Sequence, residues 1–307
     1  MRALVLGGAG MLGHRLWHEL DKHMDAFATV RGSPDDYASL GWFDLPHVIG
    51  GVDVHSDADL ERAMSEARPD VVVNAVGIVK QRRDAESATT TIAVNALLPH
   101  RLADRCAAVG ARLIHISTDC VFAGTKGTYT EQDVPDANDL YGRSKLMGEV
   151  DRDGCLTIRT SMVGREIRTS RGLFEWFFAH RGQVVPGFTR ARFSGLTTTE
   201  LSRVIADIIQ RHPELRGVWH VAGDPTTKFD LLSIVNDAFG LGSTLRADES
   251  FVCDRTLDAS RFMNATGYRP PSWPAMVAEL AADPTPYDAW ALQWTSTAHG
   301  RSTASTS

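Results

Sequence analysis

Short apolar runs alternate with amphipathic stretches over the first two thirds of the chain. Six runs are apolar enough to predict strands: 3–6, 26–30, 71–75, 113–116, 156–158 and 218–221. Between them, apolar residues recur with the period of a helix at 11–24, 57–67, 88–109 and 198–212. Strands that are apolar throughout and alternate with helices are typical of a parallel sheet covered on both faces. The pattern therefore predicts an α/β fold with a doubly wound parallel sheet.

Three glycines follow the first of these strands. Gly7, Gly10 and Gly13 form a GxxGxxG arrangement, with Met11 and Leu12 inside it, between a strand and a helix. Glycines allow a tight turn there and let backbone N–H groups approach a pyrophosphate, which the helix N-terminus also attracts. A glycine triplet alone is a weak signal, but its place at the first strand-to-helix turn strengthens it. We expect a Rossmann-type fold that binds a nicotinamide dinucleotide.

The end of the second predicted strand bears on which dinucleotide is bound. NAD-specific sites usually carry Asp or Glu there, to hydrogen-bond the ribose 2′-hydroxyl. This chain has Arg31, with Ser33 close by. A guanidinium suits a 2′-phosphate, because it donates charge-assisted hydrogen bonds. We therefore favour NADPH and keep NADH as the alternative; a solvated surface role for Arg31 is the competing interpretation.

The rhythm of the pattern changes after about residue 160. Residues 161–195 are rich in Arg, Gly and aromatic residues and show no clear period. We interpret 1–160, together with about 196–222, as a dinucleotide-binding domain, and 161–195 with 223–280 as a smaller, discontinuous substrate-binding lobe. Such a lobe would wall a cleft at the carboxyl ends of the strands, where ligands of open α/β sheets bind. The stretch 281–307 ends in Ser, Thr, Ala and Gly, and we expect a flexible tail.

Tyr141 and Lys145 lie four residues apart, which places them on one face of a helix. A tyrosine hydroxyl has a pKa near 10 and is a poor acid or base at neutral pH. A nearby ammonium lowers that pKa by stabilising the phenolate. Tyr141 would then give a proton to a carbonyl oxygen as hydride arrives on the carbon, while Lys145 holds the nicotinamide ribose. An ordinary surface helix is the competing interpretation.

A turn with two hydroxyls follows the strand 113–116. Ser117, Thr118 and Asp119 stand at its carboxyl end, where substrates bind. Thr118 would hydrogen-bond the substrate oxygen beside Tyr141 and stabilise the charge that develops there. Capping of a turn or helix is the competing interpretation. Because both motifs follow a glycine turn in the expected order, we favour the catalytic interpretation.

These motifs together resemble the extended short-chain dehydrogenase/reductases. Within them, the runs 117–131, 141–149 and 159–164 are similar to the dTDP-4-dehydrorhamnose reductase family, and the resemblance extends from Met1 to about Leu280. It implies that Thr118, Tyr141 and Lys145 are the catalytic triad. It also implies reduction of a 4-keto-6-deoxy sugar on a nucleoside diphosphate, which forms the 4-hydroxyl.

The resemblance also assigns residues to the cofactor. It implies a segment near the adenine, a turn after the strand 71–75 and a helix Asn that supports the site. With the motifs above, the expected cofactor residues are Gly7, Gly10, Met11, Leu12, Gly13, Arg31, Asp53, Val54, Asn74, Ala75, Gly77, Asn95, Ser117, Tyr141 and Lys145.

Two departures from the family pattern leave the sugar open. Cys120 stands where the family more often has Tyr, and the run 78–83 differs from the usual one. We expect Asp119 and Cys120 to contact the substrate. In the lobe, Arg190 and Arg192 lie among aromatic residues and would suit a pyrophosphate. A mixed surface loop is the competing interpretation for these two arginines.

Composition narrows the range of partners. The chain has 307 residues, 43% of them hydrophobic, and a net charge of −6, which disfavours a nucleic-acid partner. Its four cysteines show no metal-ligand spacing, so we expect reduced thiols and no metal site. The sequence has no pattern typical of a signal peptide and no apolar stretch long enough to span a bilayer. We expect a cytoplasmic protein with no membrane partner, and a homodimer is left open.

The leading hypothesis is an NADPH-dependent 4-ketoreductase of a nucleotide-linked sugar. A nucleotide-sugar epimerase is one alternative, but it needs tightly held NAD⁺, and Arg31 disfavours that cofactor. A non-catalytic, cofactor-binding regulatory subunit is another, because relatives of this fold bind a partner enzyme after losing their chemistry. Competent residues at Thr118, Tyr141 and Lys145 disfavour that alternative.

Overall fold

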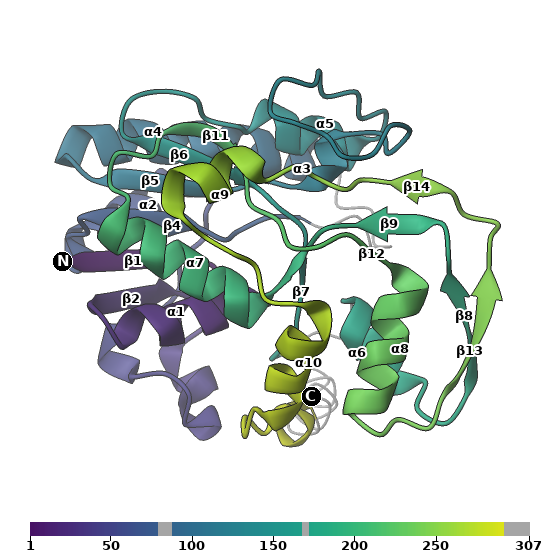
Figure 1. Cartoon of the computed structure of the whole chain (residues 1–307). Helices are drawn as coiled ribbons and strands as arrows, with labels where there is room; N and C mark the ends of the chain where they lie inside the picture. The colour runs from purple at the N-terminus through teal and green to yellow at the C-terminus, as the bar shows by residue number, and fades with distance from the viewer. Residues whose placement is uncertain (79–87, 168–171, 292–307) are drawn as a thin grey trace.

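A parallel sheet forms the centre of the molecule (Figure 1). The computed structural model describes residues 1–78, 88–167 and 172–291. Within these ranges the sheet has seven strands in the order β11-β6-β5-β4-β1-β2-β3, and all neighbours are parallel. The strands are β1 (Arg2–Leu6), β2 (Asp25–Thr29), β3 (Val48–Ile49), β4 (Val71–Asn74), β5 (Arg112–Ile116), β6 (Cys155–Arg159) and β11 (Gly217–His220). The chain reverses its winding between β1 and β4, which confirms the predicted doubly wound sheet.

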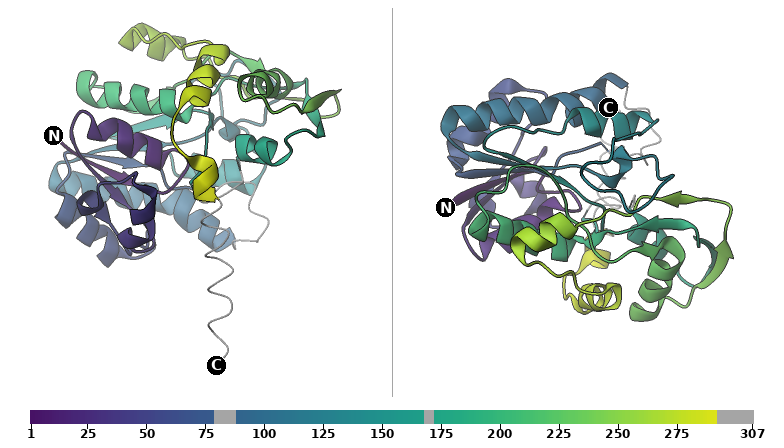
Figure 2. Two further views of the ribbon diagram at one scale, coloured as in Figure 1. Left: turned by 90° about the horizontal axis from the view of Figure 1, so that it is seen from below. Right: turned by 45° about the horizontal axis from the view of Figure 1, so that its top comes forward.

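Helices cover both faces of this sheet, as the right-hand view in Figure 2 shows. In β1, Ala3 and Val5 join the core under α1 (Gly13–Asp21) and α7 (Thr198–Arg211). Leu4 and Leu6 join the opposite core, under α2 (Asp57–Ala67) and α4 (Leu98–Val109). Because successive strand residues point to opposite faces and both faces are covered, these strands are apolar at nearly every position.

The helix predicted over 88–109 is three consecutive segments. These are α3 (Ala88–Ile92), a π-helical turn η3 (Ala93–Leu97) and α4. Pro99 has no N–H to give to the Asn95 carbonyl, which lies so close to Gly148 that a Cβ there would overlap it. The π-turn buries the Asn95 side chain completely. Such turns occur frequently at functional sites.

A second group of elements lies beyond the carboxyl ends of the strands, on the right in Figure 1. Its short strands pair across long stretches of sequence: β7 (Met162–Val163) with β10 (Leu196–Thr197), β8 (Val184–Phe188) with β13 (Thr244–Asp248), and β9 (Ala191–Phe193) with β12 (Thr226–Thr227) and β14 (Cys253–Asp254). Its helices are α6 (Leu173–Ala179), α8 (Lys228–Ala238) and α10 (Trp273–Ala282).

One helix in the range predicted for the lobe packs against the central sheet instead. This helix, α9 (Ser260–Thr266), lies beside β11, where the Phe262 ring meets Trp219 and the Arg261 guanidinium lies over the Trp219 ring. The remaining helix, α5 (Leu140–Met147), follows the strand β5 and its turn. None of the helices in the described ranges is long and apolar enough to cross a membrane.

The expectation of a flexible tail from residue 281 is wrong for its first part. After α10 the chain continues to Ala291 beside the N-terminal elements, as the left-hand view in Figure 2 shows. Tyr287 and Trp290 are only 4% and 3% exposed, and their rings meet those of His14 and Trp42. These ring contacts pack the segment against the N-terminal elements. Residues 292–307, which carry the Ser, Thr, Ala and Gly run, lie outside the described residues.

Candidate functional site

The glycine turn lies at the carboxyl end of β1. Gly7 has a φ of +84°, a conformation that favours glycine. A Cβ on Gly13 would overlap the Gly7 carbonyl oxygen, and the Gly10 N–H donates to that same oxygen at 2.9 Å. The turn therefore folds back on itself so tightly that a side chain at Gly13 would overlap the backbone, and one at Gly7 would be strained. The turn stands directly before the N-terminus of α1, which is where the motif predicts a pyrophosphate.

A cavity of about 400 Å³ lies beside the ends of β2 and β3. Its lining includes Arg31, Gly51, Asp53, His55 and Thr90. Arg31 and Asp53 were both expected at the adenosine end of the cofactor. The guanidinium suits a phosphate, and the carboxylate, whose Oδ1 accepts the His55 N–H at 3.0 Å, suits a hydroxyl. The cavity therefore holds two of the residues predicted for the adenosine end of the cofactor, one of them suited to a phosphate and the other to a hydroxyl.

Thr118 and Tyr141 meet where β5 ends and α5 begins. The Thr118 hydroxyl donates to Asp119 Oδ1 at 3.1 Å and accepts the Cys120 N–H at 3.1 Å, and it lies close enough to the Tyr141 hydroxyl to act on its pKa. Gly142 packs so closely on the Cys120 carbonyl that a Cβ there would overlap it. This contact holds α5 against the turn. The structure therefore brings together two of the three predicted catalytic side chains.

The pKa of Tyr141 does not move in the expected direction. Burial raises this pKa well above its usual value, Cys120 and Asp119 add to the rise, and the Thr118 hydroxyl opposes it. The predicted lowering by Lys145 is wrong for this structure, because the lysine Nζ donates to the Ile116 carbonyl at 2.7 Å. A tyrosine with a raised pKa keeps its proton at neutral pH, which is the state that a proton donor needs.

Lys145 lies 4% exposed behind this turn. Burial lowers the pKa of its amine to about 8. Its Nζ lies 3.5 Å from His115 Nε2, and His115 Nδ1 in turn accepts a hydrogen bond of 3.1 Å from Asn74. Asn74 also accepts the Val76 N–H at 3.1 Å. Asn74, predicted to contact the cofactor, is thus engaged in fixing the turn after β4 and the histidine behind the lysine.

Asn95 connects that turn to α5. Its side chain accepts the Ile78 N–H at 2.8 Å and donates to the Ile78 carbonyl at 3.0 Å. It also donates to the Ser144 hydroxyl at 3.2 Å, and Ser144 lies between Tyr141 and Lys145 on α5. Because Asn95 is fully buried, these bonds are shielded from water. The geometry supports the expectation that Asn95 braces the site. Ala75 and Gly77 lie in the same turn, and Gly77 is exposed.

A buried ion pair fixes the Ser117 end of the turn 117–121, the predicted catalytic turn. The Ser117 hydroxyl donates to Glu149 at 2.8 Å, and Arg159 grips the same carboxylate with two hydrogen bonds of 2.8 and 2.7 Å. The Arg159 and Glu149 side chains are 6% and 7% exposed. A bidentate pair of this kind offsets the cost of burying both charges. Ser117, predicted to contact the cofactor, therefore uses its hydroxyl to position the turn.

Arg255 brings a positive charge to the Cys120 end of this turn, and the sequence analysis did not single it out. Its Nε donates to the Phe122 carbonyl at 2.8 Å, and its Nη1 lies 3.7 Å from Cys120 Sγ. Burial raises the pKa of Asp119 and brings that of Cys120 to about 12, while the Arg255 guanidinium opposes both shifts. The charge of Lys228, at the start of α8, also opposes the rise for Asp119.

The two arginines predicted for the lobe are at other positions: Arg192 lies on β9, and Arg190 immediately precedes that strand. Arg192 forms a 2.8 Å ion pair with Asp254 and is 49% exposed, and Arg190 is exposed. No local signal marks Arg255 as the better candidate. It reaches the turn because β14 pairs with β9, with Cys253 opposite Ala191, and that pairing joins distant parts of the chain.

Comparisons with known proteins agree with this geometry. The family model described as RmlD substrate binding domain matches residues 1–282. The chain is 26% identical over 270 residues to methionine adenosyltransferase 2 subunit beta of Rattus norvegicus, covering 79% of this chain and 73% of that protein. It is 34% identical over 149 residues to dTDP-4-dehydrorhamnose reductase of Streptomyces griseus, covering 48% and 43%.

Solved structures show the same architecture. A hypothetical dTDP-4-dehydrorhamnose reductase from Sulfolobus tokodaii has a TM-score of 0.73 and 25% identity, covering 89% of this chain and 98% of that one. The dTDP-4-dehydrorhamnose reductase of Bacillus anthracis, solved in complex with NADP, has a TM-score of 0.72 and 19% identity, covering 91% and 98%. The family match spans the whole sheet and the lobe down to the end of α10. The chain therefore belongs to the RmlD substrate binding domain family, which confirms the resemblance to dTDP-4-dehydrorhamnose reductases.

Proposed function

We propose that this protein is an NAD(P)H-dependent reductase that acts on the C4 carbonyl of a nucleotide-linked keto sugar. The observation that carries the proposal is the pair of neighbouring hydroxyls, Thr118 and Tyr141, where β5 ends and α5 begins, with the buried Lys145 one helical turn further along α5. Membership of the family supports it, as does the NADP in the Bacillus anthracis neighbour. NADPH is the proposed cofactor because Arg31 lines the cavity at the adenosine end, and NADH is the alternative.

The chain's residues have distinct parts in the proposed reaction. A reduced nicotinamide dinucleotide supplies a hydride when it is bound. The glycine turn and the Arg31 cavity would hold its pyrophosphate and adenosine, and Lys145 its nicotinamide ribose. Thr118 and Tyr141 hydrogen-bond the carbonyl oxygen of the sugar, and Tyr141 gives that oxygen its proton as the carbinol forms. The raised pKa of Tyr141 keeps the phenol protonated until that moment.

The sugar nucleotide is assigned to the space between the catalytic turn and the lobe. Asp119 and Cys120 border the sugar, and the Arg255 guanidinium is placed to meet a diphosphate with its fork of N–H donors. Its present partners are the Phe122 carbonyl and weaker contacts with Ala123 and Cys120, so part of the fork is open to a stronger acceptor. A carbonyl is a weaker partner for a guanidinium than a phosphate.

A non-catalytic regulatory subunit is the second candidate. The relative from Rattus norvegicus, which matches over most of this chain, is named as a subunit beta. The neighbouring Thr118 and Tyr141 hydroxyls, with Lys145 on the same helix as Tyr141, favour the reductase. An epimerase is less favoured, because Arg31 suits NADPH rather than a permanently held NAD⁺.

The test is NADPH oxidation in the presence of a dTDP-linked 4-keto-6-deoxy sugar. Tyr141→Phe is expected to lower kcat about a thousandfold, since proton donation is worth roughly 10²–10⁴ in rate, with the Kd for NADPH within about twofold. Tyr129→Phe is the matched control, because that buried hydroxyl accepts from the Thr125 and Lys126 N–H groups away from the reacting atoms. It should keep turnover.

Two results would count against the proposal in different ways. A wild-type protein that binds NADPH but turns over none of a panel of keto sugar nucleotides would favour the regulatory subunit. A Tyr141→Phe variant that keeps half of the wild-type turnover would show that another group donates the proton.

A further inference from the structure

His14 follows the last glycine of the cofactor turn, and both of its ring nitrogens are engaged. Nδ1 lies 2.8 Å from the Gly10 carbonyl oxygen, and Nε2 lies 2.8 Å from the Tyr287 hydroxyl. The ring is fully buried, and burial lowers its pKa to about 3, so the imidazole is neutral. A carbonyl only accepts, so Nδ1 carries the single ring hydrogen and Nε2 accepts from the tyrosine. The hydrogen bonds therefore run in one direction, from Tyr287 to His14 to Gly10.

The direction of the Gly10 carbonyl decides where the next N–H points. This carbonyl accepts from both the His14 ring and the His14 backbone N–H, the latter at 3.2 Å, so it points toward α1. In a planar trans peptide the C=O and N–H bonds point in opposite directions. The Met11 N–H therefore points away from the helix, to the side where a helix N-terminus binds an anion. His14 thus fixes a donor that a dinucleotide pyrophosphate would use.

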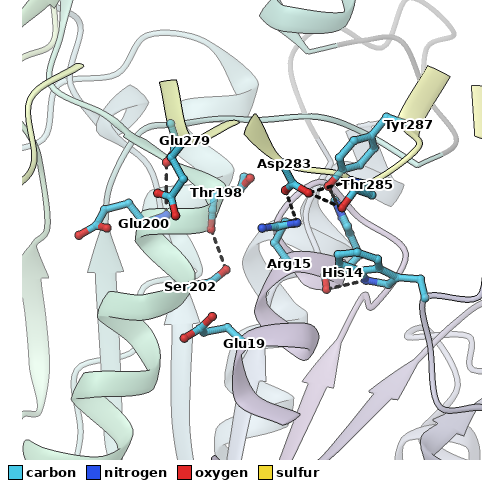
Figure 3. A network of polar contacts seen from close by, with 12 residues as sticks. His14, Arg15, Glu19, Thr198, Glu200, Ser202, Glu279, Asp283, Thr285 and Tyr287 are labelled. Atoms are coloured by element: carbon cyan, nitrogen blue, oxygen red, sulfur yellow. Dashed lines mark hydrogen bonds and ion pairs between the residues drawn. The ribbon is translucent and has the colours of Figure 1, made fainter. Parts of the chain in front are cut away.

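The tyrosine that orients His14 comes from the segment 283–291, which is fastened to α1 (Figure 3). Asp283 pairs with Arg15 at 2.6 Å, and both side chains are 12% exposed. Burial acts to raise the pKa of Asp283, but hydrogen bonds from Thr285 and the charge of Arg15 hold it below its usual value. The segment is therefore anchored by a partly shielded ion pair next to the His14 hydrogen bond.

Arg165 holds the other side of the Tyr287 ring. Its guanidinium lies 5.0 Å from the ring centroid and pairs with Asp288 at 2.6 Å and with Glu175 at 2.7 Å. Arg165 follows β7, and Glu175 belongs to α6 in the lobe. The segment therefore contacts the start of the cofactor domain and the lobe at once, and the Tyr287 hydroxyl has little room to turn away from His14.

We propose that the segment 283–291 is a positioning element of the cofactor site, which acts through the Tyr287 hydroxyl and His14 to hold the glycine turn in its pyrophosphate-binding orientation. The inference rests on the proposed function in that the ligand is a nicotinamide dinucleotide. No residue of the segment has to touch that ligand. Coupling between two sites is reciprocal. If docking of the segment lowers the Kd for the dinucleotide by some factor, the bound dinucleotide must raise the equilibrium constant for docking by the same factor.

Tyr287→Phe is the sharpest test, because it removes one oxygen and keeps the packed ring. The expected result is a rise of about tenfold in the Kd for NADPH, measured by titration of the full chain, as the loss of one oriented hydrogen bond implies. At saturating NADPH, kcat and the KM for the sugar nucleotide should stay within about twofold. A Kd equal to that of the wild type would overturn the proposal.

Tyr268→Phe is the matched control for stability. The Tyr268 hydroxyl donates to Glu200 at 3.0 Å, away from the glycine turn. Its loss should lower Tm as much as Tyr287→Phe does, yet leave the Kd for NADPH within about twofold. If both variants weaken NADPH equally, the effect of Tyr287 is general destabilisation and the proposal fails.

Hydrogen exchange supplies a readout that a merely structural role would not change. In the wild type, saturating NADPH should slow amide exchange in 283–291, and in Tyr287→Phe this protection should fall about tenfold. A wild-type chain that binds neither NADPH nor NADH contradicts the proposed function and this inference together. A wild-type chain that binds NADPH without protecting 283–291 contradicts this inference alone.

Discussion

The two walls of the proposed cleft are built from contacts of very different reach. On the cofactor wall, Gly10 and Gly13 both pack on the Gly7 carbonyl, a few residues away in the same turn. On the substrate wall, the Arg255 hydrogen bond to Phe122 spans 133 residues. One wall is therefore fixed by local sterics and the other by strand pairing across the chain. We therefore expect substitutions on the cofactor wall to disturb binding by steric overlap, and substitutions on the substrate wall to disturb it by loss of charge.

The largest effect is expected on the cofactor wall. Gly13→Ala places a Cβ onto the Gly7 carbonyl oxygen, and neither backbone can yield easily. We expect the free energy of unfolding to fall by about 3 kcal/mol, as in severe overpacking, and NADPH binding to weaken more than about a hundredfold. Chemical denaturation and a fluorescence titration measure the two quantities.

Gly110→Ala is the control that separates the steric overlap of an added Cβ from the strain of a positive φ. Gly110 has a φ of +72° but no atom within 4 Å of an added Cβ. Its replacement should cost about 1 kcal/mol and leave NADPH binding intact. If Gly13→Ala bound NADPH as tightly as this control, the turn would not be the pyrophosphate site.

The substrate wall should respond to loss of charge. Arg255→Met keeps most of the length of the side chain, and we expect kcat/KM for the sugar nucleotide to fall about thirtyfold, or about 2 kcal/mol, with NADPH affinity unchanged. Arg192→Met is the control, since Arg192 is half exposed and paired with Asp254. Steady-state kinetics should show less than about a threefold change for that variant. An equal loss of kcat/KM in both variants would indicate that the diphosphate binds at the arginines predicted from the sequence, Arg190 and Arg192.

The smallest effect concerns the choice of dinucleotide. Arg31→Ala is expected to raise the Kd for NADPH about tenfold and that for NADH less than about twofold, because only NADPH carries the 2′-phosphate. Parallel titrations with the two dinucleotides measure this ratio. Equal changes would leave Asp53, on the same cavity, as the residue that sets the preference.

Sequence patterns correctly predicted those features of the fold that depend on residues close together in the chain. The parallel sheet, the glycine turn and the helix with Tyr141 and Lys145 each follow from spacing within a few residues. The direction of the Lys145 amine does not, because it depends on the Ile116 carbonyl of a neighbouring element. Arg255 was missed for the same reason, since only the pairing of β14 with β9 brings it to the turn.

The prediction of a flexible tail over 281–307 was wrong for its first part because it used the composition of the whole stretch. Residues 292–307 carry most of the small and polar residues, and their composition hid the two aromatic anchors just before them, Tyr287 and Trp290. An aromatic pair separated by three positions is a signal that can be found in a sequence, because such spacing places both rings on one side of a helical turn. What no pattern gives is the partner, here His14 and Trp42 near the other end of the described chain.

The hydrogen bond between His14 and Tyr287 has a consequence for how the protein is made. Its two residues are 273 positions apart. At ribosomal rates of roughly 5–20 residues per second, roughly 15–55 s pass between their synthesis. Throughout that interval the nascent glycine turn lacks the tyrosine that orients its histidine. The glycine turn is thus completed only after a segment 273 positions further along the chain has been made.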